Sequence, residues 1–167
     1  MKIYTRNGDD GTTGLFYGGR VMKDSDHPCA YGDVDEAQAA IGWARSQVER
    51  GSDIDRILVH ILRDLWVLMA ELATLPENRD EHEIGVSLVT NAMVEDLEKY
   101  IDTTSEKFSA PKEFVLPGQN PTAAALDIAR TVVRRAERST LKIQEESSFA
   151  GPYLNRLSDL MWVLARW

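Results

Sequence analysis

The chain has 167 residues, 43% of them hydrophobic and 28% charged, so it can bury the core of a single domain over residues 1–167 without disulfide cross-links. Its net charge of −8 argues against a general nucleic-acid-binding role, because an acidic surface repels phosphate backbones. No apolar run approaches the roughly 20 residues of a membrane span, and the single cysteine, Cys29, suits a reducing cytoplasm.

The first 24 residues contain five glycines among small polar residues, which predicts an irregular loop. Within it, the run Thr5–Gly14 combines glycines, which let the backbone approach a ligand closely, with hydroxyl and N–H groups that can hold phosphate oxygens. The run lacks the Gly-Lys-Ser/Thr end of a P-loop. On its own it fits a phosphate-binding loop or a merely ordered terminal segment, and Lys23 fits a phosphate contact or an ordinary surface lysine.

The first predicted helix has apolar side chains at helical spacing over residues 34–48 and stops before Gly51. Asp33, Asp35 and Glu36 are expected to open this helix. Acidic residues in a first turn usually complement the helix dipole, so their local pattern needs no functional explanation.

The second predicted helix covers residues 54–72 and ends before Pro76. Leu62, Trp66 and Met69 add to its apolar stripe, so the helix is apolar around much of its circumference. We therefore expect it to be buried on most sides, either centrally or at a subunit interface.

The remaining apolar stripes predict three more helices. One spans residues 86–100, a break follows around Pro111 and Pro117, and two further helices begin near Pro121 and Pro152. No stretch alternates with period two for long and no strand–helix–strand rhythm is present. The fold class that these patterns predict is an all-α five-helix bundle with a glycine-rich N-terminal loop.

The fourth predicted helix carries the most informative pattern. Arg130, Arg134 and Glu137 share one face, and Leu126 and Val133 fall only about 40–60° from Arg130, at 100° per residue. Charges beside an apolar stripe need partners, because desolvated charge is costly. The pattern fits an ion-pair network at an interface, or a triphosphate clamp in which the planar fork of arginine matches phosphate oxygens.

The fifth predicted helix carries Asn155, Asp159 and Arg166 along one face, which by itself indicates a polar, solvated surface. The apolar patch at residues 114–118 would ordinarily pack its loop onto the core. The three histidines are far apart and lack a metal-ligand spacing.

Five runs of this sequence, taken together and in order, resemble the PduO-type ATP:cob(I)alamin adenosyltransferases. Each run is weak alone, but five in the right order make a specific match. They are Tyr4–Thr13, Ala30–Glu36, Phe114–Gly118, Ala129–Arg138 and Leu154–Asp159.

The resemblance implies a ferritin-like five-helix bundle that assembles as a homotrimer, with active sites between neighbouring subunits. It implies transfer of the 5′-deoxyadenosyl group of ATP to the cobalt of cob(I)alamin or a related corrinoid, with release of triphosphate. Mg²⁺ would be held mainly by the ATP phosphates. A reductase and an adenosylcobalamin-dependent enzyme would be the partners, the second receiving the product.

The resemblance also implies roles for individual residues. Asp35 and Arg130 would form an ion pair across the subunit boundary near the corrinoid, and Phe114 would lie under the corrin ring. Asp10 and Asn7 stand where many relatives carry lysine and threonine, which would change the affinity for the nucleotide. The implied ATP contacts are Thr5, Arg6, Asn7, Gly8, Thr13, Gly14, Lys23, Arg134, Arg135, Glu137, Arg138 and Asn155.

Two other functions fit the same residues. The protein could be a carrier that holds adenosylcobalamin and delivers it without making it. It could also be a helical assembly protein whose arginine and glutamate stripe only cements an interface, in which case ATP would not stabilise the fold.

Overall fold

The architecture is a helical bundle preceded by a small hairpin, as a computed structural model describes it for residues 2–167. The all-α five-helix fold predicted from the sequence is confirmed. In chain order the elements are β1 (Thr12–Gly14), β2 (Arg20–Met22), α1 (Asp26–Ser46), α2 (Asp53–Leu72), the 3₁₀ helix η1 (Pro76–Glu81), α3 (Asn91–Ser105), α4 (Pro121–Thr140) and α5 (Ala150–Arg166).

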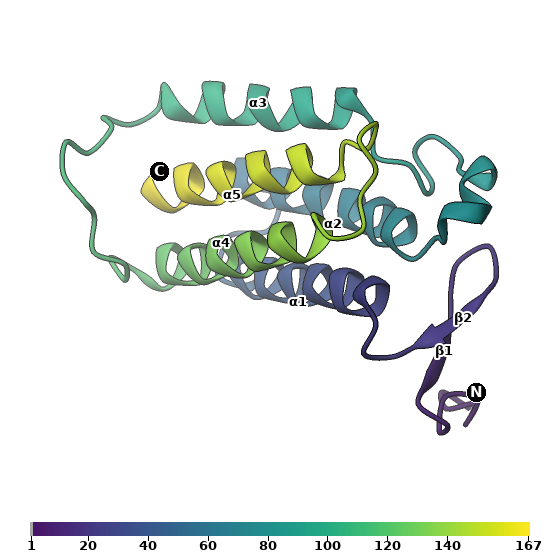
Figure 1. Cartoon of the computed structure of the whole chain (residues 1–167). Coiled ribbons are helices and arrows are strands. Elements are labelled where there is room, and N and C mark those ends of the chain that lie inside the picture. The colour runs from purple at the N-terminus through teal and green to yellow at the C-terminus, as the bar shows by residue number, and fades with distance from the viewer. Residues whose placement is uncertain (1) are drawn as a thin grey trace.

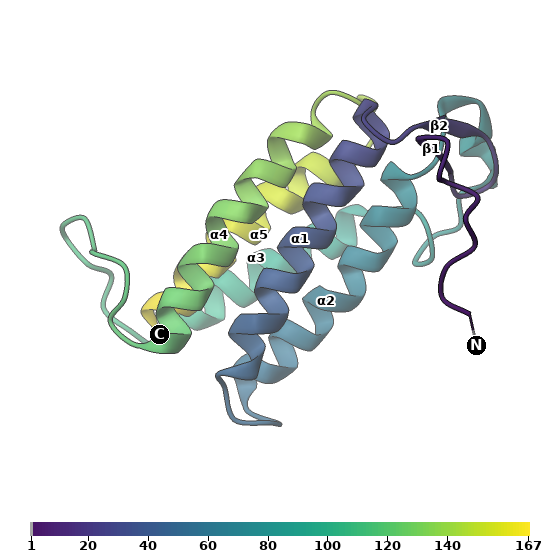
Figure 2. The same ribbon diagram turned by 90° about the horizontal axis from the view of Figure 1, so that it is seen from below.

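The helices pack side by side along their length (Figures 1 and 2), with α1 against α2 and α4, and α5 against α4 and α3. The apolar stripes face inward, and Ile41, Leu65, Leu126 and Leu157 are fully buried. Burial of these stripes is the main source of stability in such a bundle. Within residues 2–167, no helix combines the length and the apolar character needed to cross a membrane.

The N-terminal segment contains an antiparallel hairpin in which Thr13 pairs with Val21. Strands of three residues are too short to produce a visible period-two pattern, which is why the sequence predicted only an irregular loop. Gly19, at the turn, has a φ of +87°, and a Cβ there would lie 2.6 Å from Leu75 Cδ1. The N–H of Phe16 donates to the carbonyl of Ala73 at 2.9 Å, so the hairpin is fixed to the segment that follows α2.

Helix α1 begins earlier than the sequence predicted. It starts at Asp26, after the N-cap residue Ser25, so Asp33 and Asp35 lie well inside the helix and do not open it. The reason is that Pro28 fits the first turn of a helix, where a missing N–H costs nothing. The acidic residues are therefore not explained by the helix dipole.

Helix α3 begins later than the sequence predicted. It starts at Asn91, after Thr90, whose side chain accepts a hydrogen bond from the N–H of Met93 at 3.4 Å. Val86 and Val89, which were expected to belong to the helix, precede it; Val86 is 48% exposed and Val89 is buried. Val86 and Val89 continue the helical spacing across this boundary, whereas the N-cap residue Thr90 sets the true start of the helix.

Helix α2 is not central in the bundle. Its inward stripe is buried, and Leu62 and Met69 pack partly against the core, but Trp66 is 62% exposed. Of the two positions expected for this helix, the central one is therefore wrong, and the apolar face around Trp66 is left open on the single chain.

A polar cluster crosses the core between α2, α3 and α5. The fully buried Tyr153 donates its hydroxyl hydrogen bond to Asp64 Oδ2 at 3.0 Å, and Nδ1 of His60 lies 2.8 Å from the hydroxyl of Tyr100. Burial raises the pKa of Asp64. The carboxyl group thus depends on the Tyr153 hydroxyl for hydrogen bonding inside the core.

Replacing Tyr153 with phenylalanine should lower the free energy of unfolding by about 1–3 kcal/mol, because a buried acceptor then loses its donor. Urea denaturation at neutral pH would measure the change. Tyr100→Phe is the matched control and should cost less, because the Tyr100–His60 pair is only partly buried. Equal costs for the two variants would contradict a special role for the buried bond.

Candidate active site

Two basic side chains hold the N-terminal segment by donating hydrogen bonds to its backbone carbonyls. Lys23 Nζ donates to the carbonyl of Gly8 at 2.6 Å, and Arg20 Nη2 donates to the carbonyl of Asn7 at 2.6 Å. A Cβ at Gly8 would lie 2.9 Å from Lys23 Nζ and 3.0 Å from the carbonyl oxygen of Thr12, so a larger residue there would displace the lysine side chain from this position. Arg20 was not predicted as a site residue, although its position on β2 places it beside the loop.

The same segment holds an ionised carboxylate. Asp10 Oδ1 accepts hydrogen bonds from the N–H of Thr12 at 2.9 Å and from its hydroxyl at 2.7 Å. These bonds, with the backbone bond the largest cause, lower the pKa of Asp10. The loop therefore carries a fixed negative charge among Arg6, Arg20 and Lys23, and the side chain of Asp10 is engaged within the segment.

The arginines of α4 differ in what they bind. Arg135 forms ion pairs with Asp33 (3.3 Å) and Glu36 on α1, and the hydrogen bond that it donates to Glu36 raises the pKa of Arg135. Arg134 is exposed, and no side-chain partner for it is found within residues 2–167. Arg138 is also exposed and donates only to the backbone carbonyl of Arg134, at 3.0 Å. Arg134 and Arg138 are thus two exposed arginines of α4 whose guanidinium groups bind no carboxylate within residues 2–167.

Glu137 and Asn155, which the sequence predicted as ATP contacts, lie together across the α4–α5 interface. Asn155 Nδ2 donates to Glu137 Oε1 at 3.0 Å, and Arg156 Nη1 donates to Asn155 Oδ1 at 2.7 Å. Both Asn155 and Glu137 are partly exposed. The amide is therefore oriented by its neighbours, with its oxygen and nitrogen both engaged.

Arg130 pairs within its own helix. Its Nε donates to Asp127 Oδ1 at 3.3 Å, and the other oxygen of Asp127 pairs with Arg166 of α5. The Arg166 side chain is only 5% exposed, so the solvated face expected on the fifth helix is wrong at this residue. Asp35 is exposed and has no ion-pair partner within residues 2–167.

Phe114 lies on the long connection between α3 and α4 and is fully exposed. It lines a cavity of about 340 Å³ together with neighbouring loop residues and Trp162 of α5. Arg130 lines a second cavity of about 330 Å³, with Pro117 of the same connection and Ile128 of α4 among its walls. The expectation that this apolar patch packs onto the core is therefore wrong for Phe114.

The predicted residues fall at two ends of the bundle. The N-terminal segment lies where α1 begins and α4 ends, and the connection carrying Phe114 lies at the opposite end (Figures 1 and 2). Nζ of Lys142, just after α4, lies 3.6 Å from Oδ1 of Asp26 at the start of α1, so the end of α4 is held near the N-terminal segment. One chain therefore does not bring Phe114 together with residues 5–14.

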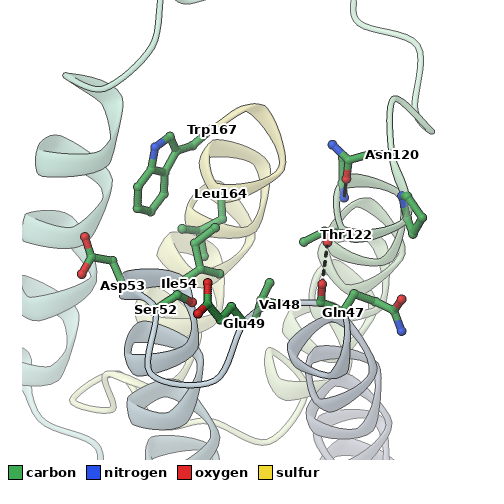
Figure 3. Close-up of a pocket in the computed structure, with 12 residues that line it drawn as sticks. Gln47, Val48, Glu49, Ser52, Asp53, Ile54, Asn120, Thr122, Leu164 and Trp167 are labelled. Atoms are coloured by element: carbon green, nitrogen blue, oxygen red, sulfur yellow. Dashed lines mark hydrogen bonds between the residues drawn. The ribbon is translucent and has the colours of Figure 1, made fainter.

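A larger cavity of about 620 Å³ lies where the α1–α2 turn meets the start of α4 and the end of α5 (Figure 3). Its floor contains Ile54 and Leu164, Trp167 covers one side, and Thr122 donates to the carbonyl of Gln47 at 3.2 Å. None of the predicted site residues lines it. Its charged lining consists of Glu49 and Asp53, as far as the described residues go, which does not suit a phosphate-rich ligand.

Acidic and thiol side chains do not gather into a metal site in the described part of the chain. No group of three or more His, Cys, Asp or Glu residues within residues 2–167 is arranged to hold an ion. The partly exposed Glu137 is the acidic side chain among the predicted nucleotide contacts.

The helical bundle has counterparts among known proteins. The sequence profile described as Cobalamin adenosyltransferase matches residues 3–167. The chain belongs to the cobalamin adenosyltransferase family and is a transferase that moves an adenosyl group to a corrinoid. Within that family its likeness is to the PduO type, so the resemblance seen in the sequence is confirmed.

Individual relatives support this placement. A corrinoid adenosyltransferase of Mycobacterium tuberculosis is 42% identical over 171 residues, covering 99% of this chain and 87% of the relative. One from Bacillus subtilis is 37% identical over 172 residues, covering 99% and 86%. A variant PduO-type ATP:corrinoid adenosyltransferase from Lactobacillus reuteri, solved with cobalamin and ATP, superposes with a TM-score of 0.87 at 32% identity, covering 99% and 89%.

Proposed function

We propose that adenosyl transfer takes place between adjacent subunits of a homotrimer. The separation of Phe114 from the N-terminal segment supports this, because each end of one chain offers only half of the predicted site. Trp66 is 62% exposed and Ile128 is 45% exposed, which gives the bundle apolar surface for subunit contact. A second chain alongside the first would supply the missing half.

The observation that carries the ATP half of this proposal is the exposed pair Arg134 and Arg138, whose donors are not consumed by carboxylates of the chain. The planar fork of arginine matches phosphate oxygens, and Lys23 adds a point charge from the loop. Arg135 would have two roles. Its ion pairs with Asp33 and Glu36 of α1 would hold α4 in place, and the same side chain would contact the nucleotide. The proposed ATP contacts are Thr5, Arg6, Asn7, Gly8, Thr13, Gly14, Lys23, Arg134, Arg135, Glu137, Arg138 and Asn155.

Mg²⁺ fits this set of donors in one way. The ion usually keeps several waters and binds through one or two carboxylates together with substrate phosphates. Glu137 can supply one carboxylate, so we propose that the phosphates of ATP supply most of the other ligands of the ion. Bound there, the ion would add positive charge near the triphosphate.

The corrinoid half would consist of Phe114, Arg130 and the neighbouring subunit's copy of Asp35. Asp35 is exposed and free to pair, and Arg130 keeps donors beyond its bond to Asp127. An apolar ring held under the corrin would keep the lower base off the cobalt. Loss of that axial ligand makes reduction of Co(II) to Co(I) easier, and the Co(I) form is the nucleophile.

The reaction needs no nucleophile from the protein. The electron pair of Co(I) attacks C5′ of ATP, the Co–C bond forms as the C5′–O bond breaks, and triphosphate leaves with the bonding electrons. The protein must hold the two reacting atoms in line and stabilise the charge that develops on the leaving group. Arg134 and Lys23 suit the second task because their charges would face the triphosphate.

Product analysis tests the proposal directly. Purified protein given reduced corrinoid and Mg-ATP under strictly anaerobic conditions should give adenosylcobalamin and triphosphate in equal amounts. Absence of both products would contradict the proposal. A carrier that only delivers adenosylcobalamin would bind the corrinoid but leave it unconverted, with Phe114 and Arg130 dispensable.

Mg-ATP should raise the melting temperature of the folded protein, because a ligand that binds only the native state stabilises it. At a concentration 100 times its Kd, the expected stabilisation is about 2.7 kcal/mol. Differential scanning fluorimetry would measure the shift, with Mg²⁺ alone as the control. No shift with Mg-ATP would instead favour a purely structural role for the charged stripe of α4.

We also propose a domain organisation, a cellular location and partners for the enzyme. We propose a single domain over residues 1–167, supported by a family match that spans residues 3–167. A cytoplasmic location is consistent with the single cysteine, since it permits no disulfide within one chain. A reductase would supply Co(I), and an adenosylcobalamin-dependent enzyme would receive the product.

A further inference from the structure

Asp127 is an almost buried carboxylate that lies between two arginines. Its Oδ1 accepts from Arg130 Nε at 3.3 Å, and its Oδ2 pairs with Arg166 Nη2 across the α4–α5 interface. The side chains of Asp127 and Arg166 are 7% and 5% exposed, whereas that of Arg130 is 28% exposed. The cluster therefore reaches from the core to the surface through Arg130.

The charges of this cluster do not balance. Two guanidinium groups share one carboxylate, so the cluster carries one net positive charge in a largely desolvated place, and such charge calls for a partner. Arg166 is enclosed, and its contact with Asp127 is made inside the bundle. A partner for the remaining positive charge can therefore reach the cluster only at Arg130. Arg130 and Asp127 both line the same cavity.

The geometry of the bond leaves Arg130 able to take that partner. A guanidinium has five N–H donors, and the bond to Asp127 uses Nε. No other hydrogen bond of the Arg130 side chain is formed within residues 2–167. Both terminal nitrogens are thus available on the side of the cavity, while Nε is held from a residue one turn earlier in α4.

We infer that Asp127 is a positioning residue for adenosyl transfer. Its carboxylate holds Nε of Arg130, so that the two terminal nitrogens of Arg130 are presented at the subunit boundary. The inference rests on the proposed function, because it assigns Asp127 a task only if Arg130 serves the corrinoid half of the site. A long arginine side chain fixed in advance loses less freedom when its second partner arrives. Arg166 keeps Asp127 in place from α5 and balances its charge.

The variant Asp127→Asn tests this, because it keeps the shape and one acceptor oxygen but removes the charge. We expect kcat to fall about tenfold or more while KM for ATP stays within about twofold, since the lost interaction lies outside the nucleotide half. The mass of the assembly, measured by light scattering, should not change. A KM increase with unchanged kcat would overturn the inference.

A second variant separates positioning from folding. Asp127→Asn leaves the buried Arg166 without a negative counter-charge and so destabilises the bundle, whereas the double variant Asp127→Asn/Arg166→Met removes that buried positive charge as well. We expect the double variant to regain thermal stability but not kcat. If kcat returns with stability, Asp127 is only structural. Asp55→Asn is the matched control, because it breaks another buried pair, Arg45–Asp55 at 2.7 Å, between α1 and α2.

A double-mutant cycle and a spectroscopic measurement complete the test. In an Arg130→Ala background, Asp127→Asn should cause no further loss of kcat; a full additional loss would overturn the inference. Hydrogen exchange at the ¹⁵N-labelled Nε of Arg130 should be slow in the wild type and faster in Asp127→Asn, and equal rates would also overturn it. The exchange measurement needs no turnover. A wild type that makes no adenosylcobalamin therefore refutes the proposed function separately.

Discussion

Replacing Arg134 with alanine should lower kcat/KM for ATP by about 10²–10³-fold, the usual cost of removing one preorganised group that stabilises developing charge. Arg134 is exposed on α4 and its side chain forms no hydrogen bond or ion pair within residues 2–167, so its loss removes no such bond from the chain. The whole effect should therefore fall on the triphosphate. Steady-state kinetics with pre-reduced corrinoid and varied Mg-ATP would measure it.

Two further variants sharpen that experiment. Arg134→Lys keeps the charge but loses the planar fork, so it should recover only part of the activity. Arg63→Ala removes another exposed arginine, on α2, and should leave turnover unchanged. If Arg134→Ala unfolds the protein or dissociates the proposed trimer instead, the charged side chains of α4 serve an interface and not the nucleotide.

The residue pattern of α4, in which arginines lie beside an apolar stripe, also illustrates what the sequence could predict. Helical spacing placed Arg130 and Arg134 next to the buried Leu126 and Val133, and the structure buries both apolar residues completely. Periodicity succeeds here because α4 is long and its inward face is uninterrupted. The five-helix fold followed from the same kind of pattern.

Partner choice could not be predicted in the same way. Asp33 and Glu36 were expected to open a helix, yet they lie inside α1 and pair with Arg135 of α4. Which carboxylate meets which arginine depends on how two helices are rotated against each other, and a single helical period does not contain that information. The i,i+3 spacing of Asp127 and Arg130 was a local signal that could have been found, but the second contact of Asp127, with Arg166, is a tertiary one.

The site as a whole was harder still to predict from one chain. The sequence order of Phe114 and the N-terminal loop says nothing of their distance, and the two lie at opposite ends of the bundle. A full exposure of Phe114 would be unexpected for a residue whose task is packing within its own chain. It is expected for a residue whose partner comes from solution, as the proposed corrin ring would.

Replacing Phe114 with alanine should therefore slow turnover far more when the reaction starts from cob(II)alamin than when it starts from pre-reduced cob(I)alamin. The difference should be about tenfold or more, equivalent to about 1.4 kcal/mol in the barrier of the reductive step. In the proposed mechanism the Phe114 ring acts before the chemistry, by excluding the lower ligand so that Co(II) can be reduced. The side chain is fully exposed, so its removal should not unfold the chain.

The matched control for this variant is Leu116→Ala, which truncates another apolar side chain of the same connection, itself 85% exposed. It should affect both starting corrinoids equally and weakly. Electron paramagnetic resonance of Co(II) bound to the protein with Mg-ATP should show loss of the axial nitrogen in the wild type and its retention in Phe114→Ala. Equal slowing from Co(II) and Co(I), with the axial ligand displaced in both proteins, would mean that Phe114 holds the corrinoid without changing its coordination.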